Sequence, residues 1–231
     1  MSSSEAGGEA RRAEPAEPAR PVRREGLAAA VAAIDSELAD ANRARETALA
    51  ACRRAIRAAG SSVRAVHRLD AGAAAARADE AGSALREAQE VLAPYPAVAY
   101  AGFLHDAEKE YAEARAVAAL VAGGPVPGPA DLGVSASAWM RGVSEAASEL
   151  RRHLLDRLRD GDVARGESLL AAMDEVYDAL VVVDYPDALT NGLRRTLDAL
   201  RAVLERTRGD VTTTVLQTRL QRAIEVRSAG S

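Results

Sequence analysis

Apolar residues recur at helical spacing along most of the chain. The stretch from Leu27 to Leu69 repeats them at positions that include Leu49, Ile56 and Val63, and it contains no proline. A recurrence every three to four residues is typical of an amphipathic helix with one buried face. The pattern predicts either one helix of unusual length or two helices in series.

Six further helical stretches follow, and turn signals separate most of them. Pro94 and Pro96 end the second helix, and a loop rich in glycine and proline at 123–133 ends the third. Pro186 stands near the first turn of a later helix, where a missing N–H costs little. The stretches cover residues 71–93, 97–121, 135–162, 163–183, 184–211 and 212–225. They predict an all-α bundle of about six or seven helices with short connections.

The N-terminal residues 1–25 do not share this pattern. They mix Ser, Gly, Glu, Pro and Arg with almost nothing apolar, a composition typical of disordered tails. We therefore expect a disordered tail at 1–25 and one helical domain at 26–228. The 231 residues are enough to bury a core without disulfides or structural metals.

Composition supports the helical interpretation and suggests a compartment. Alanine is abundant and aromatic residues make up 3% of the chain, which favours helices over sheets. The single cysteine, Cys52, excludes an intrachain disulfide, fits a reducing compartment and is expected to be packed. No stretch approaches the roughly 20 apolar residues of a membrane span, and the N-terminal residues lack the apolar core of a secretory signal. We expect a cytoplasmic protein with no membrane partner.

A row of arginines lies along one face of the first predicted helix. At about 100° per residue, Arg53, Arg57, Arg64 and Arg68 fall within one narrow arc, with His67 beside it and no acid in the stretch. Guanidinium groups bond phosphate oxygens in pairs, so this arginine row suits a nucleic-acid backbone. A solvated face gives the same pattern, so spacing alone leaves both interpretations open. The net charge of −4 does not decide between them, because binding depends on where charges lie.

Acidic residues form a second charged pattern on two later helices. Asp106, Glu110 and Glu113 lie at i, i+4 and i+7, and Glu145 and Glu149 lie at i and i+4. Like charges at this spacing destabilise a helix slightly unless a cation balances them. Carboxylates on facing helices can pool into one site for Mg²⁺ or Mn²⁺. The alternative is a set of ordinary surface ion pairs with neighbouring arginines.

Enzyme motifs of other classes are missing from the chain. The sequence has no phosphate-binding loop, no zinc spacing of cysteine and histidine, and no glycine-rich dinucleotide fingerprint. Its three histidines are dispersed. The acidic pattern is therefore the candidate for catalysis, and the arginine row is the candidate for binding.

Five segments are similar to the translin family in their order and spacing. They read SSVRAVHR, YAGFLHDAEKEYAEA, LGVSASAWMRGVSEAASELRR, DYPDALTNGLRR and ERTRGDVT. KEYAEA and DYPDAL…GLRR are the more specific pieces. The resemblance extends over roughly Leu27–Glu225, and it is strongest to the archaeal branch that resembles translin-associated factor X.

The resemblance implies a fold, an assembly and an activity. It implies about seven helices and a closed shell of about eight subunits that encloses single-stranded RNA or DNA. The factor-X-type subunit of the family carries a magnesium-dependent endoribonuclease site. The family's Glu-x-x-Glu pair matches Glu110 and Glu113, and Glu145 stands where the catalytic branch more often has aspartate. Glu149 matches a further family glutamate, and Asp106 is an additional candidate ligand.

Three functions follow from these patterns. In the first, Glu110, Glu113 and Glu145 are the catalytic residues of an endoribonuclease and hold Mg²⁺ or Mn²⁺ with support from Glu149 and Asp106. The arginine row and His67 then hold the strand. In the second, the protein binds single-stranded RNA or DNA without cleaving it. In the third, it is a helical protein with no nucleic-acid partner. We expect the first function, with the second as the alternative.

Overall fold

The computed structural model describes residues 22–229, which are almost entirely helical. The long helices in this range are α1 (Val22–His67), α2 (Ala71–Leu92), α4 (Phe103–Ala122), α6 (Ala136–Arg159), α7 (Val163–Val181) and α9 (Leu193–Ala229). Short helices of four residues lie in the connections: α3 (Pro96–Ala99), α5 (Pro129–Leu132) and α8 (Asp187–Thr190). Residues 22–229 contain no strand, so the prediction of an all-α fold is confirmed. None of the helices in this range is apolar over a length that would cross a bilayer.

The chain divides into two compact units, residues 1–40 and 41–231. Residues 1–21, most of the predicted tail, lie outside the described residues, and the described part of the first unit is the beginning of α1. The side chains described there are exposed. Its large apolar residues, which we call the N-terminal stripe, recur at i, i+4, i+7 and i+11: Leu27, Val31, Ile34 and Leu38. This spacing places them on one helix face.

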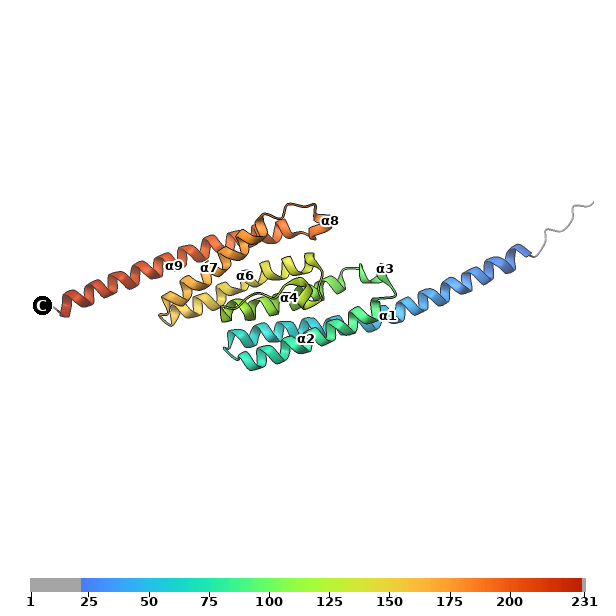
Figure 1. Cartoon of the computed structure of the whole chain (residues 1–231), viewed down its shortest axis with the longest axis horizontal. Helices are drawn as coiled ribbons and strands as arrows, with labels where there is room; N and C mark the ends of the chain where they lie inside the picture. The colour runs from blue at the N-terminus through green and yellow to red at the C-terminus, as the bar shows by residue number, and fades with distance from the viewer. Residues whose placement is uncertain (1–21, 230–231) are drawn as a thin grey trace, which may run out of the picture. The chain divides into compact units, whose positions relative to one another are not determined.

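The core of the second unit consists of two apolar clusters, and α4 contributes to both. One cluster joins α4 to α6, α7 and α9 through residues such as Val117, Leu150 and Met173. The other joins α1, α2 and α4, and most of its members are alanine. Figure 1 shows α4 beside α6 within this unit, the helix pair that carries the predicted acids. Because α4 is fixed on both sides, side chains on its α6-facing surface have well-defined positions.

Cys52 lies in the alanine-rich cluster, as a packed thiol should. Its side chain is buried. Burial raises the pKa of the Cys52 thiol to about 11, with a smaller contribution from the Glu108 carboxylate. A thiol with a pKa this high is a poor nucleophile at neutral pH.

Glycine allows α4 and α6 to approach closely at one point. A Cβ atom added at Gly142 of α6 would lie 2.5 Å from the carbonyl oxygen of Lys109 and 2.9 Å from the amide nitrogen of Glu113. No side chain fits at that separation, so the backbone contact requires glycine. The crossing lies one turn from Glu145, between the helices that carry the acids.

Two helix boundaries differ from the sequence prediction. The predicted helix at 97–121 is interrupted after α3, where Gly102 adopts a φ of 96°, and it resumes as α4. The predicted helices at 184–211 and 212–225 are instead α8 followed by the single helix α9. The predicted boundary falls at the threonine run 212–214, where β-branched residues disfavour a helix. In α9 the Thr213 hydroxyl donates to the Gly209 carbonyl at 2.9 Å, and Thr214 repeats this pattern.

Candidate functional site

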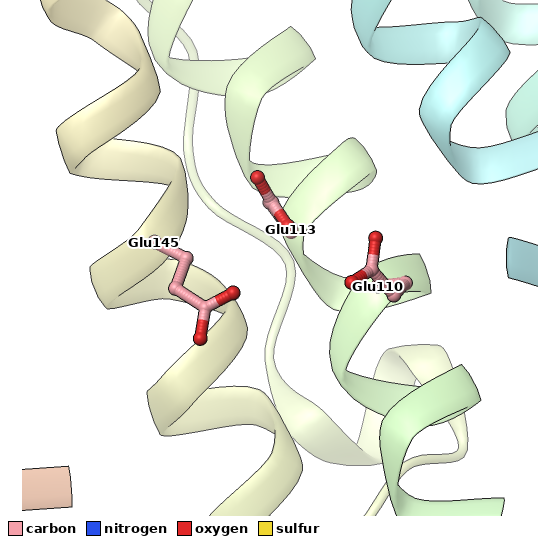
Figure 2. A group of neighbouring side chains, drawn as sticks. All are labelled: Glu110, Glu113 and Glu145. Atoms are coloured by element: carbon pink, nitrogen blue, oxygen red, sulfur yellow. The ribbon is translucent and has the colours of Figure 1, made fainter. Parts of the chain in front are cut away.

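Three of the predicted acids converge between α4 and α6. Glu110 and Glu113 lie on α4, Glu145 lies on α6, and each offers one carboxylate oxygen within 4.8 Å of the others. All three side chains are half-buried. Figure 2 shows Glu145 on the helix that neighbours the one carrying Glu110 and Glu113. We call this group the carboxylate cluster.

Glu113 has a strongly shifted pKa. Burial, followed by the charge of Glu110, raises the pKa of Glu113 from its ordinary value of 4.5 to about 7. Glu145 and Glu149 raise it further, while the Lys109 ammonium opposes them. A carboxyl group whose ionisation is opposed first by burial and then by neighbouring carboxylates is a candidate for a functional site.

Two basic side chains balance the rest of the carboxylate cluster. The Lys109 ammonium donates to Glu110 Oε1 at 2.9 Å and to Glu145 Oε2 at 2.5 Å. Arg141 Nη2 lies 3.6 Å from Glu145 Oε1. Among residues 22–229, no cation pairs with Glu113. The side chain with the raised pKa is therefore also the one without a positive partner.

The donor set fits a hard divalent cation. Carboxylate oxygens are the ligands that Mg²⁺ and Mn²⁺ prefer, and Mg²⁺ keeps several waters besides a few protein oxygens. Two oxygens on one Mg²⁺ ion are at most about 4.2 Å apart. The carboxylate separations of up to 4.8 Å therefore require only modest side-chain rotation.

The other two predicted ligands lie apart from this group. Glu149 is engaged by α1, because its Oε1 lies 2.6 Å from His67 Nε2. Asp106 is exposed in the first turn of α4. Neither belongs to a group of ligand atoms within reach of one ion in the described part of the chain. The charge of Glu149 still acts on the carboxylate cluster, because it helps to raise the pKa of Glu113.

The structure places the arginine row on an open surface of α1. The four side chains are exposed: Arg53, Arg57, Arg64 and Arg68. None of them pairs with a carboxylate of another described residue, and Arg64 donates only to the Ser61 hydroxyl at 2.8 Å. Their neighbour Arg54, by contrast, pairs with Glu87 at 2.5 Å. These four guanidinium groups are thus available to an anion.

His67 differs from these arginines, although the sequence grouped it with them. Its side chain is 5% exposed and its Nε2 contacts Glu149, so it packs α1 against α6. The neighbouring residues Ala65 and Val66 are buried. This part of α1 therefore packs against the core, and His67 lies on its packed side. His67 is therefore not part of the exposed arginine row, and its role in binding nucleic acid stays a prediction.

One buried acid that supports the site was missed by the sequence reasoning. Glu108 accepts hydrogen bonds from the Ser135 amide at 3.1 Å, the Ser135 hydroxyl at 2.7 Å and Gln89 Nε2 at 3.0 Å. Ser135 caps the N-terminus of α6. Glu108 thereby fixes the start of α6 to α4, and this contact helps to set the position of Glu145 along α4. The sequence signal that could have identified Glu108 is its position on the α4 face opposite Glu110, which separates it from the other acids.

Solved structures share this fold. The chain is similar to a crystal structure of AfC3PO, with a TM-score of 0.76 and 28% identity over 81% of this chain and 97% of that chain. It is also similar to a structure of AfC3PO in complex with duplex RNA, with a TM-score of 0.66 and 30% identity over the same shares. A crystal structure of apo-NeC3PO has the same fold, with a TM-score of 0.71 and 18% identity over 80% of this chain and 96% of that chain.

Sequence comparison gives a further relative. An uncharacterised protein of Methanocaldococcus jannaschii is 26% identical over 189 residues, which cover 80% of this chain and 82% of that protein. No family model matches the chain. In both kinds of comparison the similarity covers about four fifths of this chain.

Proposed function

Because the chain belongs to the translin-like family of the C3PO proteins, we propose that it binds single-stranded nucleic acid and cleaves RNA with a divalent cation. The observation that carries the nuclease part is the convergence of Glu110, Glu113 and Glu145 from two helices. The binding part rests on the arginine row, whose side chains are exposed and make no ion pair with any other described residue. The AfC3PO structure with duplex RNA adds support for a nucleic-acid partner.

The three glutamates of the carboxylate cluster would hold Mg²⁺ or Mn²⁺. Such an ion supplies charge stabilisation to a phosphodiester and an activated water for its hydrolysis. Glu110 and Glu113 are held by α4 and Glu145 by α6, so the crossing at Gly142 keeps them in register. The residues of the arginine row would bond phosphate oxygens of the strand.

Binding without cleavage is the second candidate function, and one observation favours it. Lys109 already pairs with both Glu110 and Glu145, so these two acids have a structural role without any bound ion. In this case the arginine row alone carries the function, and the carboxylate cluster only joins two helices.

Incubation with labelled RNA separates the two functions. Single-stranded and duplex RNA are incubated with purified protein and Mg²⁺, with EDTA as the control. The nuclease proposal predicts cleavage that EDTA abolishes and that Glu113→Ala lowers on the order of 100-fold or more, with RNA binding retained. Glu205→Ala, which removes an exposed glutamate of α9, is the matched control and keeps wild-type cleavage. Unchanged cleavage in Glu113→Ala would refute the assigned site.

We also propose that copies of the chain assemble into a closed shell of about eight subunits. The N-terminal stripe supports this proposal, because four large apolar residues on one face of a helix are exposed in the single chain. The mass of the native particle tests it, since one chain has a mass of 24.2 kDa. Replacing Val31 and Leu38 by Asp should then lower the measured mass. A wild-type particle with the mass of one chain contradicts the proposal.

A further inference from the structure

Lys109 is the only lysine among the 30 lysine and arginine residues of the chain, and all the others are arginine. It does not lie on the open surface. Its side chain is 11% exposed and lies inside the carboxylate cluster. Because buried lysines are rare and are nearly always paired, the contacts of this ammonium identify its role.

The Lys109 ammonium joins the two helices that form the cluster. It contacts Glu110 of α4 at 2.9 Å and Glu145 of α6 at 2.5 Å. Two of the three converging carboxylates therefore already share one positive charge. The third, Glu113, makes no ion pair with any described residue. A cation shared by all three would therefore have to contact the same two carboxylates as this ammonium.

Lysine and arginine differ in how easily the charged group can move away from its carboxylate partners. An ammonium is a compact charge on a flexible four-carbon stem, whereas a guanidinium holds carboxylates through a rigid planar fork. The chain uses arginine for its surface ion pairs, such as Arg54–Glu87 and Arg208–Asp174. It uses its single lysine at the position where three carboxylates converge.

We infer that Lys109 is an internal counter-cation that positions Glu110 and Glu145 and competes with a divalent ion for these two carboxylates. This inference rests on the proposed function, because it assigns the divalent ion to the same three glutamates. An ammonium and a divalent cation repel each other strongly at hydrogen-bonding distances in a half-buried site. Binding of the ion therefore requires the Lys109 ammonium to release one or both of its hydrogen bonds.

Metal affinity of charge-removing variants tests the competition. The probe is Mn²⁺ alone, and its dissociation constant is measured by electron paramagnetic resonance in the absence of RNA. Lys109→Gln is expected to bind Mn²⁺ about tenfold more tightly or better, while Lys109→Arg, which keeps the charge, shows no such gain. A merely structural lysine predicts weaker binding in Lys109→Gln, because the cluster would lose its support.

Arg141→Gln is the matched control for charge alone. It removes one positive charge near the same cluster, but Arg141 lies 3.6 Å from Glu145 and makes no contact with Glu110. We expect a smaller gain in Mn²⁺ affinity than in Lys109→Gln. Equal gains in both variants, or no gain in Lys109→Gln, overturn the inference. Absence of Mn²⁺ binding in both the wild type and Lys109→Gln overturns it as well.

The wild-type protein offers a second measurement that needs no variant to fold. Labelling with ¹³C-lysine gives one set of side-chain signals, because the chain has one lysine. Addition of Mg²⁺ is expected to shift the Lys109 ε-methylene signal, and the shift is lost in Glu113→Gln. A signal that does not move at saturating Mg²⁺ overturns the inference. Cleavage is assayed separately, so a protein that releases Lys109 on binding Mg²⁺ but leaves RNA intact refutes only the nuclease.

Discussion

The carboxylate cluster and the arginine row are both groups of like charges on helices, but the fold treats them in opposite ways. The carboxylates converge from α4 and α6, are half-buried, and include one group whose pKa rises to about 7. The arginines follow a single helix, are exposed and have no carboxylate partners among the described residues. One group is thus concentrated and partly balanced by Lys109 and Arg141, and the other is spread out and unbalanced.

The difference follows from the solvent around each group. In a half-buried site the effective dielectric constant is low, so neighbouring carboxylates repel strongly and a compensating cation is needed nearby. On an exposed helix face, water and salt screen the repulsion beyond about 10 Å. A concentrated group is suited to one small multivalent ion, and an extended group is suited to a chain of phosphates.

A substitution of Gly142, where α4 and α6 cross, should have the largest effect on the difference between the carboxylate cluster and the arginine row. In Gly142→Ala the added methyl meets the Lys109 carbonyl oxygen at 2.5 Å, so α4 and α6 must separate. We expect a loss of about 1–3 kcal/mol in the free energy of unfolding, together with loss of divalent-ion binding. Denaturant unfolding and Mn²⁺ titration measure the two effects.

Gly60 of α1 gives the matched control on the arginine row. A methyl there would meet only Arg64 Nη1 at 3.4 Å, and this exposed side chain can move away. Gly60→Ala is therefore expected to stabilise the protein by about 0.5–1 kcal/mol through better helix propensity. Equal stabilities of the two variants would show that the α4–α6 crossing does not depend on glycine.

The pH dependence of stability should show a smaller effect, confined to the carboxylate cluster. The folded protein raises the pKa of Glu113 from 4.5 to about 7, so it holds this proton more tightly than the unfolded chain does. The resulting stability is fully present below about pH 4.5 and is lost as the pH rises through about 7. Without divalent ions, Glu113→Gln should remove this decline and exceed the wild type in stability above pH 7.

Thermal unfolding in EDTA across this pH range measures the decline. Glu205→Gln, at an exposed position of α9, serves as the control and should follow the wild-type curve. Divalent ions should bind more tightly as the pH rises through about 7, because they require the ionised Glu113. Wild-type and Glu113→Gln curves that run parallel would contradict the origin assigned to this decline.

Charge removal from the arginine row should have the smallest effect, and only on binding. Arg57→Gln combined with Arg64→Gln removes two charges that pair with no carboxylate among the described residues. The slope of log affinity against log salt should therefore fall by about 1.4 for single-stranded RNA. Arg54→Gln with Arg208→Gln removes two paired charges, because these side chains contact Glu87 and Asp174. Fluorescence anisotropy at several salt concentrations compares the two double variants. The same slope in both would mean that the arginine row is not the binding surface.

Much of the fold could be predicted because helical periodicity is a local property of the chain. The first residues of α2 and α6 follow N-caps, since the Asp70 and Ser135 side chains accept hydrogen bonds from backbone amides of the first turn. The errors at α4 and α9 came from competing local signals. Gly102 breaks a helix that its neighbours favour, and the threonines of α9 satisfy their hydroxyls within a helix that their branching disfavours.

The site was predictable only in part. Spacing placed Glu110 and Glu113 on one face of a helix, and the translin resemblance associated them with Glu145. Nothing local to the sequence showed that His67 contacts Glu149, or that Lys109 bridges two of the acids. These contacts join residues far apart along the chain, so they depend on how the helices pack.

Local sequence is sufficient for the all-helical chain, the faces of its helices and the order of charges along them, because each depends on residues within a few turns of one another. Which charges meet in space depends on how the helices pack. The glycine crossing of α4 and α6 brings three carboxylates within 4.8 Å, with Lys109 among them, and it leaves the arginine row in water. Electrostatic energy depends on distance and burial in space, and packing between helices sets both.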